Sequence, residues 1–149
     1  MEHTQPSRLD VLALDLEGTL ISNAMSQIAR PGLYEFLERC QMLFPRIVMF
    51  TTVREDLFRD IARLLVAEEA APAWFQGVEY VHWQGKTKDL SYIANAVPAR
   101  TVLVDDFEAY VHPGQEAQWL AIAQFEHPYS DTDTGLLTTL QQLEVRVYD

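Results

Sequence analysis

The feature that most constrains this chain is a series of short apolar runs that recur along the sequence. Four carry no charge, at residues 11–14, 47–50, 101–104 and 120–123, and a weaker run lies at 78–81. Unbroken apolar runs are typical of strands buried on both faces, as in a parallel sheet covered by helices. The runs alternate with segments of helical periodicity. The sequence therefore predicts an α/β fold, a three-layer α/β/α Rossmann-like sandwich with a mainly parallel central sheet and right-handed crossovers.

Two longer helices are predicted after the first and second runs. The first has apolar residues at positions i, i+3, i+4 and i+7, namely Leu33, Phe36, Leu37 and Cys40. It starts behind Pro31, a residue that is favoured in the first turn of a helix. The second helix spans residues 53–68, where Thr52 and Glu55 have the spacing of a capping box. Shorter helices are predicted at 90–96 and 134–143. The last of these lies behind two capping candidates, which are Ser130 and Asp131.

The length predicts a single domain. A chain of 149 residues can bury one sizeable core, whereas two domains would each be near the lower limit for independent folding. We expect the domain to cover residues 1–149 with its core at about 9–143. Residues 1–8 are expected to be loose, and the tail 144–149 is expected to add an edge strand or to fray.

Charge and cysteine content exclude several functional classes. There are 22 acidic and 11 basic residues, and the net charge of −11 predicts that neither nucleic acid nor an anionic membrane is a partner. The single cysteine cannot form an internal disulfide, the histidines lack zinc spacing, and the glycines are too far apart for a dinucleotide or Walker loop. No apolar run is long enough to span a membrane, and the first residues do not resemble a signal peptide, so we expect a cytoplasmic location.

Polar residues directly follow three of the predicted strands. They are Asp15, Glu17, Thr51, Asp105 and Asp106. Because open parallel sheets bind ligands beyond the carboxyl ends of their strands, we expect these side chains to gather on one rim. Lys86 and Lys88, the only two lysines, lie ahead of the third strand. Their confinement to one short segment indicates a specific task for one of them.

This order of motifs resembles the haloacid dehalogenase superfamily of aspartyl-phosphate phosphatases. The Asp-x-acid-x-Thr motif at 15–19, a threonine, a lysine and an acidic pair follow one another within residues 9–143. Segments 30–37, 49–51 and 88–91 are most similar to the small, capless C-terminal-domain phosphatases and the NLI-interacting-factor-like subgroup. The resemblance implies a phosphomonoester hydrolase without a cap domain. Because such a site is open, it also implies a phosphorylated protein or another bulky phosphomonoester as the substrate.

The resemblance implies four catalytic residues. Asp15 would be the nucleophile at phosphorus, and Glu17 the general acid that protonates the leaving group and then activates water. Positions two apart on a strand share a face, so both carboxylates can address one substrate. Thr51 would hydrogen-bond a phosphate oxygen, and Lys88 would neutralise charge, with Lys86 as an alternative for that lysine.

The resemblance also implies a Mg²⁺ ion. Asp106, the Asp15 carboxylate and the backbone carbonyl of Glu17 would hold it, and Asp105 would steady these ligands. Two like charges 4 Å apart repel by about 4 kcal/mol at an effective dielectric constant of about 20, and a phosphate dianion meets several carboxylates here. One lysine cannot offset them, so the metal is predicted to be obligatory.

Other interpretations remain open. Glu17 stands where the superfamily usually has aspartate, so the alternative is a catalytically weak or inactive domain that binds a phospho-ligand or a protein. A response-regulator receiver uses similar chemistry, but its acidic pair opens the chain, whereas Asp106 lies late. The sequence does not indicate an oligomeric state. Four aromatic residues are expected to pack under a loop rather than to contact substrate, namely Trp74, Phe75, Tyr80 and Trp83.

Overall fold

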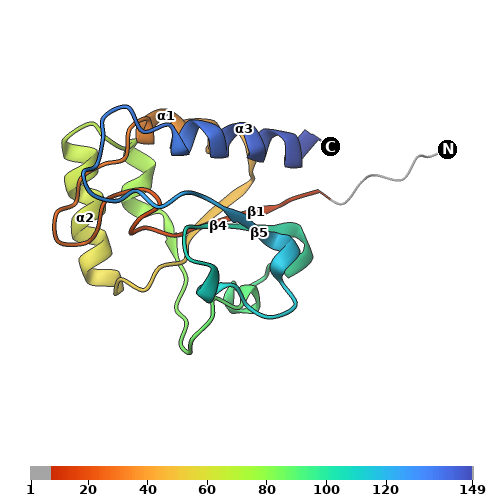
Figure 1. Ribbon diagram of the computed structural model, residues 1–149. Helices are drawn as coiled ribbons and strands as arrows, with labels where there is room; N and C mark the ends of the chain where they lie inside the picture. The colour runs from red at the N-terminus through yellow and green to blue at the C-terminus, as the bar shows by residue number, and fades with distance from the viewer. Residues whose placement is uncertain (1–7, 149) are drawn as a thin grey trace.

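The computed structural model describes residues 8–148, and its centre is a parallel sheet with strand order β3-β2-β1-β4-β5 (Figure 1). The strands are β1 (Val11–Leu14), β2 (Arg46–Met49), β3 (Glu79–Tyr80), β4 (Thr101–Asp105) and β5 (Trp119–Ala121). Each neighbouring pair of strands is parallel, and each strand overlaps one of the apolar runs. The prediction of an α/β Rossmann-like fold around a parallel sheet is confirmed.

The central strand β1 faces a hydrophobic cluster on each side of the sheet. Leu12 and Leu14 belong to the larger cluster, whereas Val11 and Ala13 belong to the smaller one. Successive side chains of a strand point to opposite faces, so a strand covered on both sides needs apolar residues at every position. This explains why the first run has no polar interruption.

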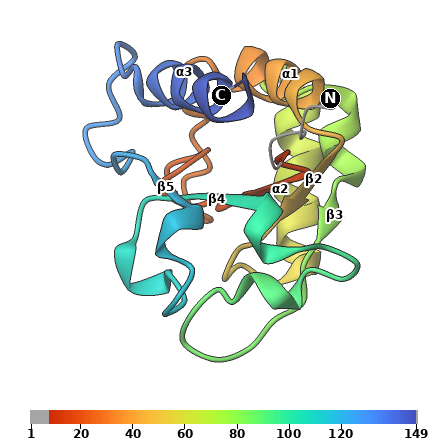
Figure 2. The same ribbon diagram turned by 90° about the vertical axis from the view of Figure 1, so that its right-hand side faces the viewer.

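Among residues 8–148, α-helices cover one of these two clusters and not the other. The larger cluster receives side chains from α1 (Leu33–Leu43), α2 (Glu55–Ala67) and α3 (Gly135–Tyr148). Helices α1 and α3 lie side by side over the sheet (Figures 1 and 2). The smaller cluster is closed by side chains from the segment that follows β3, including Leu90 and Ile93. The layer on that face therefore consists of loops and short 3₁₀ turns.

Two predicted helix starts are wrong. Helix α1 begins after Gly32, whose left-handed backbone (φ 81°) leaves Pro31 ahead of the helix rather than in its first turn. The capping box of Thr52 with Glu55 does not form, because the backbone is still extended at Arg54 and α2 begins at Glu55 itself. A residue at the first helical position cannot take the third-residue place that a capping box requires.

Helix α3 is longer than predicted. The carboxylate of Asp133 accepts the Gly135 N–H at 3.0 Å, so Asp133 serves the start of the helix, and the candidates Ser130 and Asp131 do not. The helix continues to Tyr148, which corrects the expectation of an edge strand or frayed tail at its end. The apolar stripe of the helix explains its length, since it packs into the larger cluster through Leu136, Leu140, Leu143 and Val147.

The predicted helix at 90–96 is reduced to a single 3₁₀ turn, η2 (Leu90–Tyr92). Asp89 caps this turn by accepting the Ser91 N–H, and the backbone is extended again at Ile93. Lys88 therefore does not open a helix. It forms an isolated parallel bridge with Val111, which holds its backbone against another loop.

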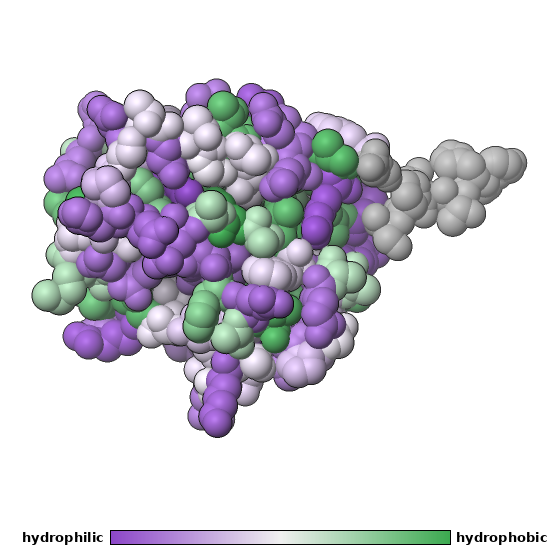
Figure 3. Space-filling model, in the orientation of Figure 1, coloured by the Kyte–Doolittle hydropathy of each residue, from purple (hydrophilic) through white to green (hydrophobic). Residues whose placement is uncertain are grey.

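The molecular surface is mainly hydrophilic on the face shown in Figure 3, where hydrophobic residues are scattered. Within residues 8–148, no helix combines the length and apolarity that a membrane span requires. The expected loose segment 1–8 falls almost entirely on residues 1–7, which lie outside the described residues.

Candidate functional site

The candidate site lies where three parallel strands end together. Strand β1 lies between β2 and β4, and its last residue, Leu14, is in register with Met49 and Val104. One position further, Asp15 follows β1 and Asp105 ends β4. The Asp15 N–H donates to the Val104 carbonyl at 3.0 Å, which fixes the two carboxylates at the same edge.

Three carboxylates meet at this edge. Asp15, Asp105 and Asp106 each offer an oxygen, and these atoms all lie within 4.8 Å of one another. Asp15 and Asp105 are buried, and Asp106 is half-buried. The structure thus brings together three of the acidic residues that the sequence singled out.

Lys88 is the lysine that reaches this cluster. Its Nζ donates to Asp15 Oδ1 at 2.9 Å and to Asp105 Oδ2 at 2.5 Å, and the side chain is fully buried. The same Nζ lies 4.8 Å from the centre of the Tyr110 ring. Lys86 is exposed. Of the two lysines between which the sequence left the choice open, the structure places Lys88 in the cluster and Lys86 at the surface.

Thr19 is a member of the cluster that the sequence interpretation left without a role. Its hydroxyl lies 2.8 Å from Asp15 Oδ2 and 3.3 Å from Asp106 Oδ1. Gly18, which directly precedes Thr19, has φ +76°, and a Cβ there would lie 2.5 Å from Asp106 Oδ2. Only glycine lets the loop pass so close to that carboxylate. The position of Thr19 within the same motif as Asp15 was the available signal.

The electrostatics of the cluster follow from burial and crowding. Burial and the Asp15 charge raise the pKa of Asp105, against the opposing effect of Lys88. Burial, a hydrogen bond with Asp15 and the charges of Asp15 and Asp105 raise the pKa of Asp106. Burial alone would lower the pKa of Lys88, but its two carboxylate partners raise it. The lysine is therefore held charged among carboxylates that repel one another.

This donor set fits a hard divalent cation. It offers carboxylate oxygens from Asp15, Asp105 and Asp106, with the Thr19 hydroxyl next to them, and oxygen is the ligand that Mg²⁺ prefers. With all three carboxylates ionised, the single positive charge of Lys88 leaves an excess of negative charge in a mostly buried place. A cation would relieve the mutual repulsion of these carboxylates, which adds to burial in raising the pKa values of Asp105 and Asp106.

Glu17 and Thr51, the other two predicted catalytic residues, are hydrogen-bonded to partners outside the cluster. The Glu17 carboxylate accepts the Ala24 N–H at 2.7 Å, and it is not among the three clustered carboxylates. Thr51 is buried, and its Oγ1 accepts the Val53 N–H at 3.0 Å. A hydroxyl that accepts one hydrogen bond still has its own proton to donate.

Arg30 supports the loop from behind, and the sequence interpretation gave it no such role. Its fully buried guanidinium pairs with Asp133 at 2.6 Å and donates to the carbonyls of Thr19 (3.2 Å) and Gly18 (3.4 Å). It also lies 5.4 Å from the centre of the Phe125 ring. No local pattern predicts this burial, because Asp133 lies 103 positions further along the chain.

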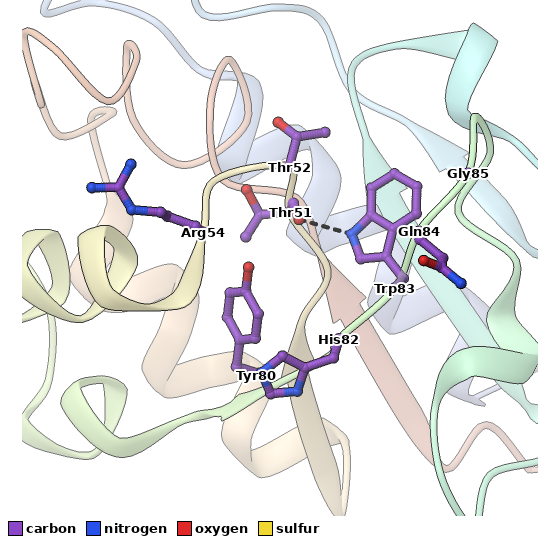
Figure 4. A pocket seen from close by; sticks show the side chains of 8 residues that line it. All are labelled: Thr51, Thr52, Arg54, Tyr80, His82, Trp83, Gln84 and Gly85. Atoms are coloured by element: carbon purple, nitrogen blue, oxygen red, sulfur yellow. Dashed lines mark hydrogen bonds between the residues drawn. The ribbon is translucent and has the colours of Figure 1, made fainter.

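A pocket of about 400 Å³ opens beside Thr51 (Figure 4). Two of its walls are aromatic and are fixed by hydrogen bonds: Trp83 Nε1 donates to the Thr51 carbonyl at 2.8 Å, and the Tyr80 hydroxyl donates to the Val53 carbonyl at 2.5 Å. Tyr80 and Trp83 were expected only to pack under a loop, but they also line this pocket. The lining residues are Thr51, Thr52, Arg54, Tyr80, His82, Trp83, Gln84 and Gly85.

Comparison with known proteins agrees with this arrangement. Residues 10–148 match the family described as NLI interacting factor-like phosphatase. No curated protein matches the chain. The family match covers nearly the whole described structure and includes every residue of the carboxylate cluster. The chain therefore belongs to the NLI interacting factor-like phosphatase family.

Proposed function

We propose that this protein is a Mg²⁺-dependent phosphomonoester hydrolase that works through an aspartyl-phosphate intermediate on Asp15. Family membership supports phosphatase function. The observation that carries the proposal is the buried Lys88 ammonium between Asp15 and Asp105, at the edge where three carboxylates meet. A buried cation beside a nucleophilic carboxylate offsets the charge of an incoming phosphate, which would otherwise be repelled.

In this mechanism, a carboxylate oxygen of Asp15 forms a bond to phosphorus while the bond from phosphorus to the leaving-group oxygen breaks. Glu17 gives a proton to that oxygen and then takes one from the water that hydrolyses the acyl phosphate. Phosphate is released, and Asp15 is restored. The Thr51 hydroxyl and the Lys88 ammonium hold phosphoryl oxygens throughout.

The proposed metal ligands are the carboxylates of Asp15 and Asp106 and the backbone carbonyl of Glu17, with Asp105 as their support. Bound Mg²⁺ would supply the positive charge that lets a phosphate dianion approach these carboxylates. Thr19 keeps two of the ligands in place, because its hydroxyl bridges Asp15 and Asp106. Without a cap domain, the site suits a phosphorylated protein or another bulky phosphomonoester.

The test is phosphate release from p-nitrophenyl phosphate by the wild type, Asp15→Asn and Lys88→Met, each with Mg²⁺ and with EDTA. We expect release only with Mg²⁺, none from Asp15→Asn, and a loss of about 100-fold or more for Lys88→Met. Lys86→Met, at the exposed lysine, is the matched control and should retain wild-type activity. Metal-independent release, or full activity in Asp15→Asn, would overturn the proposal.

One observation favours a second function, that of a phospho-ligand-binding domain without turnover. The Glu17 carboxylate is bound to the Ala24 N–H at 2.7 Å, away from the clustered carboxylates. If it stays there, the acid and base step is missing. Mg²⁺-dependent binding of phosphate, with no release from any ester by folded protein, would identify this function instead.

A further inference from the structure

We propose that the pocket beside Thr51 receives the ring of an aryl phosphate, so that the site prefers phosphotyrosine to alkyl phosphates such as phosphoserine. This inference rests on the proposed function and names its substrate class. It is carried by the aromatic walls of the pocket, by their connection to Lys88 and by the position of the Glu17 carboxylate.

The pocket and the phosphate-binding group share one residue. Thr51 lines the pocket and, in the proposed function, contacts a phosphoryl oxygen. Figure 4 shows Tyr80 and Trp83 on the two sides of Thr51, so a substrate whose phosphate lay at Thr51 would have its leaving group beside these rings. Both rings are fixed by hydrogen bonds to backbone carbonyls, so the hydrogens that they could donate are already used. What they offer a ligand is rigid aromatic surface, which suits another ring.

Aromatic packing connects the pocket to the cluster. The Trp83 ring packs edge-on against Tyr110 at 6.3 Å, and Tyr110 lies under the Lys88 ammonium at 4.8 Å. The Trp83 ring also contacts Phe50 at 5.5 Å, which holds it against the sheet. Packed aromatic rings therefore connect the pocket to the side chain of Lys88.

The charge of the lining agrees with an anionic aryl ester. No carboxylate lines the pocket, although the whole chain has a net charge of −11. Arg54 is a lining residue that forms an ion pair with Asp56. Both partners are exposed, so the pair adds little stability and the guanidinium can turn toward a ligand. His82, another lining residue, pairs with Glu55 at 2.9 Å.

The Glu17 hydrogen bond points to the same substrate class by a separate route. A phenol such as tyrosine has a pKa of about 10, whereas an aliphatic alcohol is closer to water at about 15.7. A phenolate can leave without a proton. An aryl ester therefore depends least on protonation by Glu17, whose carboxylate is hydrogen-bonded to the Ala24 N–H. The phosphorus–oxygen bond breaks, its electron pair leaves with the phenolate, and solvent water supplies the proton that the phenolate takes up.

The test measures the ratio of kcat/KM values for a phosphotyrosine peptide and the matching phosphoserine peptide. Loss of the hydrogen bond from Trp83 to Thr51 would slow both substrates equally. A change in the ratio therefore reports the contact between the pocket and the aryl ring. We expect it to fall by about 10-fold or more in Trp83→Leu and to be partly restored in Trp83→Phe. Thr52→Phe, which fills the pocket from an exposed position, should lower it similarly. Thr138→Phe, exposed on α3, is the matched control.

Phenyl phosphate separates the ring from the rest of the peptide. If the pocket binds the ring itself, Trp83→Leu should lower kcat/KM for phenyl phosphate by the same factor as for the phosphotyrosine peptide. A second arm uses Glu17→Gln, whose amide oxygen can still accept from Ala24. We expect it to slow the phosphoserine peptide at least about 10-fold more than the phosphotyrosine peptide.

The possible results separate this inference from the proposed function. An unchanged ratio in Trp83→Leu and Thr52→Phe, with both peptides still hydrolysed and both stopped by Asp15→Asn, overturns the aryl pocket and leaves the phosphatase proposal standing. A wild-type preference for phosphoserine overturns it in the same way. No release from either peptide or from phenyl phosphate, by folded wild type with Mg²⁺, overturns the proposed function and this inference with it.

Discussion

Arg30 and Asp133 form a pair in which one partner is fully buried and the other is partly exposed. Two hydrogen bonds join them, at 2.6 and 3.2 Å, and the same guanidinium donates to the carbonyl of Thr19. The start of α3 is thereby tied to the loop that carries the candidate site. The two partners are not equivalent, because removing Asp133 leaves a charge without its counter-ion in the core.

Asp133→Asn should therefore lower the free energy of unfolding by about 3 kcal/mol, the range found when one member of a buried pair is lost. Urea unfolding at neutral pH measures this. The control is Glu144→Gln, which removes the more exposed pair with Arg39 and should cost less than about 1 kcal/mol. Equal effects of the two substitutions would show that the Arg30 charge is not confined as described.

The same carboxylate predicts a pH dependence. Partial burial would raise the pKa of Asp133, but hydrogen bonds from Arg30 and the Gly135 N–H together lower it below its usual range. A folded-state pKa below the unfolded value of about 3.9 gives stabilisation that is present above that value and is lost as the pH falls through the folded-state pKa.

The measurement is the difference in unfolding free energy between the wild type and Asp133→Asn, from about pH 6 to about pH 3. We expect this difference to be constant at the upper end and to shrink below about pH 4. Asp131→Asn, at an exposed neighbour, should differ little from the wild type throughout. A difference that grew as the pH fell would contradict the sign.

Gly18→Ala should disrupt the site more than it disrupts the fold. The new Cβ would lie 2.5 Å from Asp106 Oδ2, and φ is +76°. Gly32→Ala is a matched control, because φ is +81° there and nothing lies within 4 Å of the added carbon. Both variants incur backbone strain of about 1 kcal/mol. Phosphatase activity should fall by about 100-fold or more only in Gly18→Ala, and similar activities would contradict the close approach to Asp106.

Mg²⁺ should stabilise the protein through the carboxylate cluster. At about 100 times its dissociation constant a ligand adds about 2.7 kcal/mol, which for a chain of this size raises the melting temperature by roughly 5–10 °C. Thermal unfolding with Mg²⁺ and with EDTA measures the shift. Asp106→Asn should lose most of it, and the exposed Asp131→Asn should keep it. A full shift in Asp106→Asn would place the cation elsewhere.

The strands could be predicted because their signal is local. A strand such as β1, buried on both faces, must be apolar at every position, and its bounds at Val11–Leu14 agree with the run. Helix ends depend on contacts that the sequence does not display. Thr52 and Glu55 have capping-box spacing, yet the extended backbone at Arg54 prevents the box. The length of α3 depends on the cluster into which its apolar residues pack.

The clustered residues Asp15, Asp105, Asp106 and Lys88 could be anticipated from their order along the chain, because strand ends in a parallel sheet meet at one edge. Residues whose positions depend on partners far away in the sequence could not be anticipated in this way. Arg30 is buried because Asp133 reaches it from the far end of the chain. Trp83 lines a pocket because its indole is bound to the Thr51 carbonyl, which spacing alone does not reveal.

The unequal covering of the sheet bears on the local dynamics of the site. Lys88 belongs to the face that is closed by loops and 3₁₀ turns, where few backbone amides are secured by regular helical bonds. Amide hydrogens of this segment should exchange with deuterium sooner than those of α1 and α3. Lys88 lies in this segment, so an opening that included it would separate its ammonium from Asp15 and leave that carboxylate without its counter-ion.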